Sequence, residues 1–187
     1  IQTLDIAGDG MIWMSDANER IFRLDPATLS FTTFAIPAAT FPGGCGAFGI
    51  EVAPGGDIFF ACTVTRSIGR LQPAGPTWTR FGFGAGLPDP PMEIAFDDAG
   101  VDWFTIASAA GGSPGFGWLD PAHPASAGWL SSAGFFRPHG IVSSGGFIWF
   151  VDHSWDGADS QLVRVDRVTH AHLDVAIPGA DDCHYLA

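Results

Sequence analysis

The chain has 187 residues, 47% of them apolar, with 20 acidic residues against eight basic ones. All eight basic residues are arginine, and the net charge of −12 argues against nucleic-acid and anionic-membrane partners. The absence of lysine excludes Schiff-base chemistry and phosphate loops that depend on lysine. No apolar run reaches the roughly 18 residues of a membrane span. An acidic protein of this kind is expected to bind cations or neutral ligands, with no nucleic acid and no membrane as partner.

A short β-hairpin recurs along the chain. Each copy joins an apolar segment, a turn that contains glycine, and a second segment with an aromatic residue, a pattern that suits a pleated strand pair. The copies run over residues 4–14, 49–60, 93–104 and 137–152. The aromatic markers of the second segment, Trp13, Phe59, Trp103 and Trp149, are 46, 44 and 46 residues apart. This spacing indicates a structural repeat.

A second marker keeps the same period. It lies at residues 24–26, 71–73, 119–121 and 165–167, with spacings of 47, 48 and 46, so each unit contains two hairpins. A repeat of about 40 to 50 residues with four short strands is typical of a β-propeller blade. Helical repeats are excluded because glycine and proline interrupt every candidate helix.

The sequence therefore predicts an all-β fold, a β-propeller with four four-stranded antiparallel blades and the start of a fifth. The predicted blades of this single propeller domain or segment cover residues 1–37, 38–84, 85–135 and 136–179, and residues 180–187 form the first strand of a further blade. An open arc of blades leaves sheet faces uncovered. We therefore expect missing blades, a partner chain or oligomer that completes the propeller, or a small closed four-blade ring. The chain starts at Ile1 without an initiator methionine or a signal-like segment, which suggests a trimmed product or a fragment and leaves the compartment open.

The place of other residues in the repeat predicts whether they are buried or exposed. Trp13, Trp103 and Trp149 are predicted to lie in the core, and His123, His170 and His172 in solvent. The small, glycine-rich insert at residues 107–115 is predicted to be a mobile loop. The chain has three cysteines, none in a Cys-x-x-Cys spacing, so a structural zinc site is not expected. The hairpin brings Cys45 and Cys62 towards one rim, where they form either a disulfide or two buried thiols.

The fourth hairpin offers a chemical site. Its turn at residues 144–146 places His139 nearly opposite Val151, so that His139, Asp152 and His153 crowd one rim. An imidazole near a carboxylate suits acid–base or metal-binding chemistry. The alternative is a histidine that only hydrogen-bonds the backbone of the next blade, and the residues alone leave both open.

The repeat as a whole resembles the streptogramin B lyase (virginiamycin B lyase) family of β-propellers. The resemblance rests on a Gly-Ile strand, a Gly-Asp turn, a Trp-Phe-x-Asp ending and an Ile-Gly-Arg-Leu-x-Pro segment, as at residues 67–73, and it covers all four units. It implies a propeller of usually seven blades and a magnesium-assisted carbon–oxygen lyase that opens a cyclic depsipeptide antibiotic by elimination at its ester. Antibiotic resistance is the biological role that this implies.

The resemblance also implies site residues. His139 and His184 match the two histidines that face the axis, with His184 as the base, and Asp182 matches the acidic residue before it. We predict His184 and His139 as catalytic residues, and Asp182 and Asp152 as ligands of Mg²⁺. The sequence departs from the family pattern at Cys183, where proline is expected, and at Tyr185, where glycine is expected, and the blade with a metal-holding glutamate lies beyond Ala187.

The main functional reading is thus a lyase that acts on a small-molecule cyclic ester or depsipeptide. The alternative is a non-enzymatic β-propeller binding module for a protein or a glycan, which needs exposed aromatic residues on loops. Trp155 is the candidate for that role. Fold alone does not decide between them.

Overall fold

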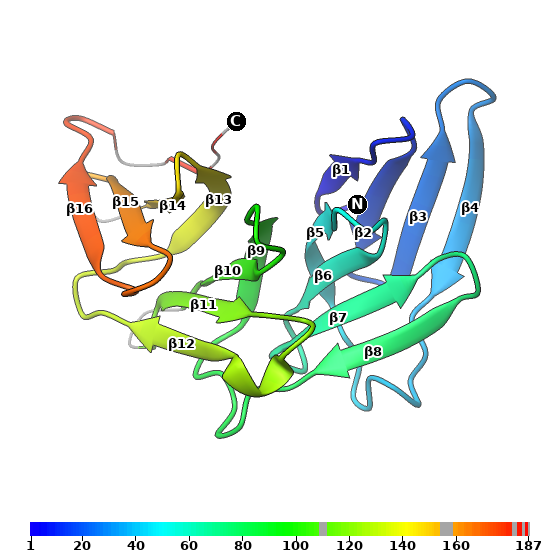
Figure 1. The fold of residues 1–187 in the computed structure, drawn as a ribbon, viewed down its shortest axis with the longest axis horizontal. Helices are drawn as coiled ribbons and strands as arrows, with labels where there is room; N and C mark the ends of the chain where they lie inside the picture. Colours follow the sequence, from blue (N-terminus) through cyan, green and yellow to red (C-terminus); the bar gives the residue numbers. More distant parts are fainter. Residues whose placement is uncertain (109–111, 154–158, 181–182, 185, 187) are drawn as a thin grey trace. The chain divides into compact units, whose positions relative to one another are not determined.

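The computed structural model describes residues 1–108, 112–153, 159–180, 183–184 and 186. These residues form sixteen β-strands and one short 3₁₀ helix at Pro124–Ser126 (Figure 1). The chain divides into two compact units, residues 1–92 and 93–187, and each unit is described by itself. Within the described residues no helix has the length and apolar character needed to cross a membrane.

The first unit contains two four-stranded sheets, each made from one continuous stretch of chain. The first sheet has the order β1 (Leu4–Ile6), β2 (Ile12–Asp16), β3 (Arg20–Asp25) and β4 (Ser30–Ala35). The second has the order β5 (Ala47–Val52), β6 (Ile58–Cys62), β7 (Ser67–Gln72) and β8 (Thr77–Phe81). Neighbouring strands are antiparallel and follow one another in the chain, so each sheet is a pair of hairpins.

The second unit repeats this arrangement. Its first sheet consists of β9 (Pro91–Phe96), β10 (Asp102–Ile106), β11 (Gly115–Leu119) and β12 (Gly128–Ser131). Its second sheet consists of β13 (Pro138–Ser144), β14 (Phe147–Asp152), β15 (Gln161–Asp166) and β16 (His172–Ala176). Four meandering four-stranded sheets with almost no helix match a β-propeller-like fold, so the predicted fold class is confirmed.

The four aromatic markers occupy the second strand of their sheets. Trp13 lies on β2, Phe59 on β6, Trp103 on β10 and Trp149 on β14. In three of the four sheets the marker pairs with an arginine on the third strand: Trp13 with Arg23, Phe59 with Arg70, and Trp149 with Arg164. The Arg23 guanidinium lies 5.7 Å from the Trp13 ring centroid, and that of Arg164 lies 6.0 Å from the Trp149 ring centroid, within the range of a cation–π contact. The repeat therefore places the marker on the same strand in all four sheets, whereas the arginine partner is absent in the third, where Trp103 pairs with Trp118.

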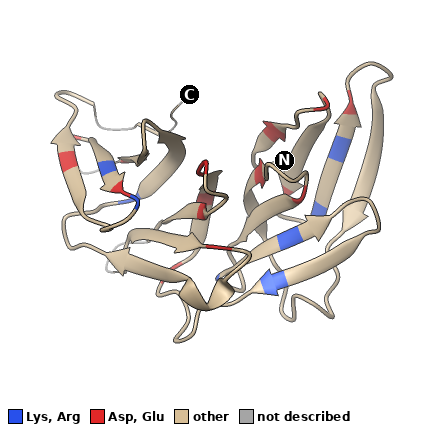
Figure 2. Ribbon diagram, viewed as in Figure 1, with Lys and Arg blue, Asp and Glu red and all other residues tan. Residues whose placement is uncertain are grey.

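Figure 2 shows where these charges lie. The arginines on β3, β7 and β8 appear as blue segments on the third and fourth strands of the first unit, away from the first strand of each sheet. Acidic residues occupy the first strands, with Asp5 on β1 and Glu51 on β5. The Asp5 carboxylate accepts a 2.8 Å hydrogen bond from the Val52 backbone N–H, which links the two sheets of the first unit.

The core of each unit lies between its two sheets. In the first unit the fully buried side chains include Ile21, Phe41, Ile58 and Phe60. In the second unit Trp103 and Phe116 pack against Ile148 and Phe150. Side chains alternate along a strand, so Trp149, between Ile148 and Phe150, points to the other face of its sheet. It is half-buried there, and the prediction that Trp149 is a core residue is wrong, whereas Trp13 and Trp103 are buried as predicted.

Cys45 and Cys62 form a disulfide. Both are fully buried in the core of the first unit, where the disulfide joins the segment before β5 to the end of β6. Of the two possibilities that the sequence left open, the structure therefore has the bridge. Cys183 is a free cysteine.

The three histidines predicted to lie in solvent differ from one another. His123 is exposed beside Asp120, as predicted. His170 is not, because its ring lies 3.7 Å, centroid to centroid, from the Trp118 ring, and this packing half-buries it. His172 is exposed, as predicted, although its ring lies 5.0 Å from that of Phe135, centroid to centroid.

Two further expectations fall wholly or partly outside the described residues. Trp155 is one of them. The other is the mobility of the 107–115 insert, of which residues 109–111 are outside, while Ala107 and Ser108 at its start are buried.

Candidate functional site

A β-bulge sets the direction of His139. Pro138 pairs with Asp152 and Ile141 pairs with Phe150, so His139 and Gly140 together lie opposite the single residue Val151. An extra residue of this kind bends a strand and changes where its side chains point. The bulge recurs in the first unit, where Ala47 pairs with Cys62 and Ile50 with Phe60. The same bulge thus occurs near the start of β5 and of β13, and in β13 it carries an imidazole.

The Asp152 carboxylate holds the chain that enters β13. It accepts hydrogen bonds from the backbone N–H of Phe136, at 3.0 and 2.9 Å, and from that of Arg137, at 2.6 Å. Asp152 is fully buried, and this burial raises its pKa to about 6 against the opposing effect of the two backbone amides. These contacts fix the backbone immediately before Pro138 and His139, whereas the role of Asp152 as a metal ligand stays a prediction.

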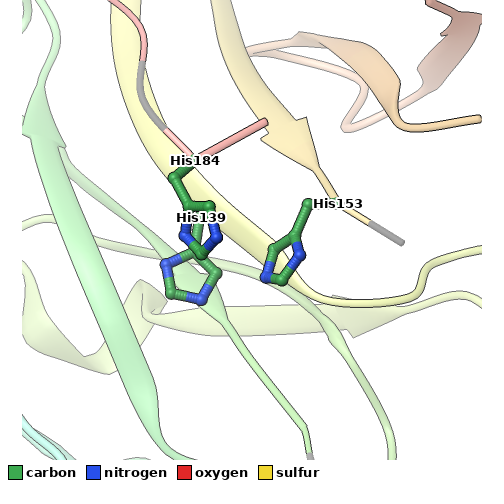
Figure 3. Close-up of side chains that lie close together, drawn as sticks. All are labelled: His139, His153 and His184. Carbon is green, nitrogen blue, oxygen red and sulfur yellow. The ribbon is translucent and has the colours of Figure 1, made fainter. Parts of the chain in front are cut away.

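Three imidazoles meet at the start of β13. His139 lies on β13, His153 follows β14 directly, and His184 belongs to the C-terminal segment (Figure 3). The ring centroids of His139 lie 5.0 Å from those of His153 and 5.1 Å from those of His184, and the His153 and His184 centroids are 4.3 Å apart. One ring nitrogen from each residue can be chosen so that all three lie within 4.8 Å of one another. The structure thus places the two histidines expected at the site, His139 and His184, side by side.

His153 was expected on the same rim as His139 and Asp152, but no catalytic or metal-binding role was predicted for it. Its signal was its position directly after Asp152, on the rim where His139 was expected, yet no family motif marks it. It is fully buried, and its ring centroid lies 5.0 Å from that of His139 and 4.3 Å from that of His184. The site is therefore a cluster of three imidazoles rather than a pair.

Burial controls the protonation of His139. The residue is 5% exposed, and burial, together with the nearby positive charges that His153, His184 and Arg137 carry when protonated, lowers its pKa to about 4. Its imidazole is therefore neutral at neutral pH. Within the part of the chain that the structure describes, neither Nδ1 nor Nε2 of His139 has a hydrogen-bond partner.

Asp182, predicted as a metal ligand, lies outside the described residues. Glu93 on β9 is 9% exposed, and burial raises its pKa to about 7. The sequence shows Glu93 only as the first residue of a repeat hairpin and gives no sign that its carboxyl group is buried.

No family model and no curated protein sequence matches the chain. Several solved structures share its fold. A catalytically inactive variant of virginiamycin B lyase from Staphylococcus aureus, solved with quinupristin, superposes with a TM-score of 0.76 at 20% identity, over 96% of this chain and 56% of that one. A streptogramin B lyase gives a TM-score of 0.75 at 22% identity, over 94% of this chain and 54% of that one. A putative gluconolactonase gives 0.70 at 12% identity, over 94% and 62%.

These similarities confirm at the level of the fold the resemblance to virginiamycin B lyase that the repeats indicate. Identities near 20% carry the likeness no further than the fold. The chain spans little more than half the length of the lyases that it matches.

Proposed function

We propose that the protein is a carbon–oxygen lyase that opens a cyclic depsipeptide or a related cyclic ester by elimination. The observation that carries this proposal is the contact between the rings of His139 and His184, with centroids 5.1 Å apart. Two neighbouring imidazoles suit proton transfer near pH 7, and burial keeps that of His139 neutral.

In this mechanism His184 is the base. A ring nitrogen of its imidazole takes a proton from the carbon next to the carbon that bears the ester oxygen. The electron pair of that C–H bond forms a C=C bond, the C–O bond breaks, and the ester leaves as a carboxylate while the ring opens. His139, which burial keeps neutral, offers a ring N–H to the ester carbonyl and so orients the substrate.

Magnesium, which the family resemblance implies, does not fit the described donors. Mg²⁺ prefers oxygen ligands in an octahedral arrangement, whereas the cluster offers imidazole nitrogens. The carboxylate of Asp152 is fully buried and accepts hydrogen bonds from two backbone amides. Magnesium binding through Asp182 stays a prediction, and no step of the mechanism is assigned to the metal. Because the chain spans about half of the similar lyases, we propose that further site residues come from outside it.

The test is product analysis with quinupristin, the compound in the similar lyase structure. The complete protein that contains this chain is incubated with it, and the products are separated and weighed by mass spectrometry. Elimination opens the ring without changing the mass, whereas hydrolysis adds one water. A linear product of unchanged mass supports the proposal; a hydrolysed product, or no product from quinupristin and a panel of cyclic esters, contradicts it.

The alternative is a binding module for a protein or a glycan, and such a module would give no ring-opened product in the same experiment. Its candidate aromatic, Trp155, lies outside the described residues. That alternative would be favoured if the protein binds a protein or a glycan, consumes no ester, and keeps the same affinity after His184→Ala.

A further inference from the structure

We propose that His139, His153 and His184 form a binding site for a borderline divalent metal ion of the Zn²⁺, Co²⁺ or Ni²⁺ type. This inference goes beyond the proposed lyase activity and does not rest on it. It concerns only side chains of the second unit that the structure describes. An ion bound to His184 occupies the imidazole that the elimination uses as its base, so the lyase proposal concerns the metal-free site and the metal-bound site is expected to be inactive in ring opening.

The geometry brings three suitable ligand atoms together. One ring nitrogen of each histidine lies within 4.8 Å of the other two. In a tetrahedral zinc site, with zinc–nitrogen distances of about 2.0–2.1 Å, the ligand nitrogens are about 3.4 Å apart. Small rotations of the side chains would close the difference, and Figure 3 shows the three side chains close together, each from a separate segment of the chain.

The surroundings of His139 give an independent reason. The side chain is 5% exposed, yet both of its ring nitrogens lack a hydrogen-bond partner within the described residues. Buried polar atoms are rarely left without a partner, and each such atom needs an explanation. A metal ion bound to one of these nitrogens supplies that partner.

The donor chemistry selects the type of ion. Imidazole suits zinc, copper, nickel and cobalt, whereas magnesium and calcium require oxygen donors. Three imidazoles without a carboxylate therefore favour a borderline ion over the magnesium implied by the fold. A set of three protein ligands also leaves a fourth position for water or for an oxygen of a ligand.

The scaffold around two of the ligands is firmly held. The β-bulge sets His139, and the Asp152 carboxylate, through Phe136 and Arg137, fixes the backbone that leads to it. His153 follows Asp152 directly, so the same hydrogen bonds position both ligands. Supporting contacts of this kind orient metal ligands and increase affinity. His184 then completes the set, so a bound ion would connect the C-terminal segment to β13 and β14.

The test is metal titration of the whole chain after treatment with a chelator. Zn²⁺ and Mg²⁺ are titrated by calorimetry, and Co²⁺ by its visible absorption. We expect one Zn²⁺ per chain, tetrahedral Co²⁺ bands, and no saturable Mg²⁺ binding in the zinc range. His153→Gln removes one ligand and should weaken zinc binding by at least about 10- to 100-fold. That is the usual effect of losing a residue that only hydrogen-bonds a ligand, and losing a ligand itself should cost no less. His123→Gln, at an exposed histidine in a turn, is the matched control and should leave binding unchanged.

A second variant excludes the neighbouring thiol. Cys183→Ser removes the free cysteine beside His184 and should leave zinc binding intact. If His153→Gln fails to fold by circular dichroism, zinc X-ray absorption on the unmodified chain decides: three imidazole ligands with one oxygen ligand support the site, and sulfur ligation or fewer than three imidazoles overturns it. The proposal also fails if zinc does not bind, or if His123→Gln weakens binding as much as His153→Gln does. Ring opening by the metal-free protein without any zinc binding overturns only this inference, and zinc binding by a protein whose metal-free form opens no ester overturns only the lyase proposal.

Discussion

The ring centroids of His139 and His184 lie 5.1 Å apart, although 45 residues separate the two positions in the chain. That separation is one period of the repeat. The tail residue His184 thus lies beside the residue that stands one period earlier in the chain. The repeat therefore brings two histidines that are distant in the sequence into one site.

The disulfide should contribute substantially to the stability of the first unit. It joins residues 17 positions apart, and closing a loop of about this length in the unfolded chain corresponds to about 3 kcal/mol. Replacing both cysteines, Cys45→Ser and Cys62→Ser, should lower the free energy of unfolding by about that amount in urea denaturation. Cys183→Ser is the control, because Cys183 is free, and it should have little effect. Equal stability of the double variant and the unmodified protein would show that the bridge does not form.

Two tryptophans at equivalent positions should differ in their importance. Trp103 is 2% exposed and packed in the core of the second unit. Trp149 is half-buried, on the face of its sheet that points away from this core. Trp103→Ala should cost about 3 to 5 kcal/mol of stability, the range for a large aromatic removed from a core. Trp149→Ala should cost less, because it leaves no enclosed cavity. Thermal and urea unfolding of the two variants compare them directly, and equal losses would show that both tryptophans are enclosed.

These residues show how far the sequence leads. The spacing of Trp13, Phe59, Trp103 and Trp149 was enough to predict four two-hairpin sheets, because strand pairing is local and its turns are marked by glycine. It did not predict the burial of Trp149, which depends on whether another sheet covers that face. The sequence also could not choose between a bridge and two thiols, since that depends on the distance between strands.

The same limit applies to the site. The approach of His139 and His184 follows from the period, and that of His153 to His139 from hairpin register. The engagement of Asp152 with backbone amides depends on the local path of the chain before Pro138, which no motif encodes. The burial of Glu93 is likewise a property of packing and not of its neighbours in the sequence.

The buried Glu93 carboxyl group should make stability fall with rising pH. Burial raises its pKa from 4.5 to about 7, so the folded state binds a proton more tightly than the unfolded state does. The resulting stabilisation is full below pH 4.5 and is lost as the pH rises to about 7, a change of about 3 kcal/mol for this group.

Glu93→Gln removes this dependence and keeps the size of the side chain. Urea denaturation at pH 4 and pH 8 should show that the glutamine variant gains about 3 kcal/mol on the unmodified protein between the two values. Asp9→Asn, in an exposed turn, is the control. Parallel stability curves for Glu93→Gln and the unmodified protein would show that the carboxyl group is solvated.

The most direct test of the proposed lyase is the rate of ring opening in two histidine variants of the complete protein. His184→Ala removes the base and should lower the rate by about 10²- to 10⁴-fold, the usual contribution of general base catalysis, without changing the circular dichroism spectrum. His123→Ala, at an exposed turn beside Asp120, should retain the full rate. Ring opening at the unmodified rate in folded His184→Ala protein would contradict the account.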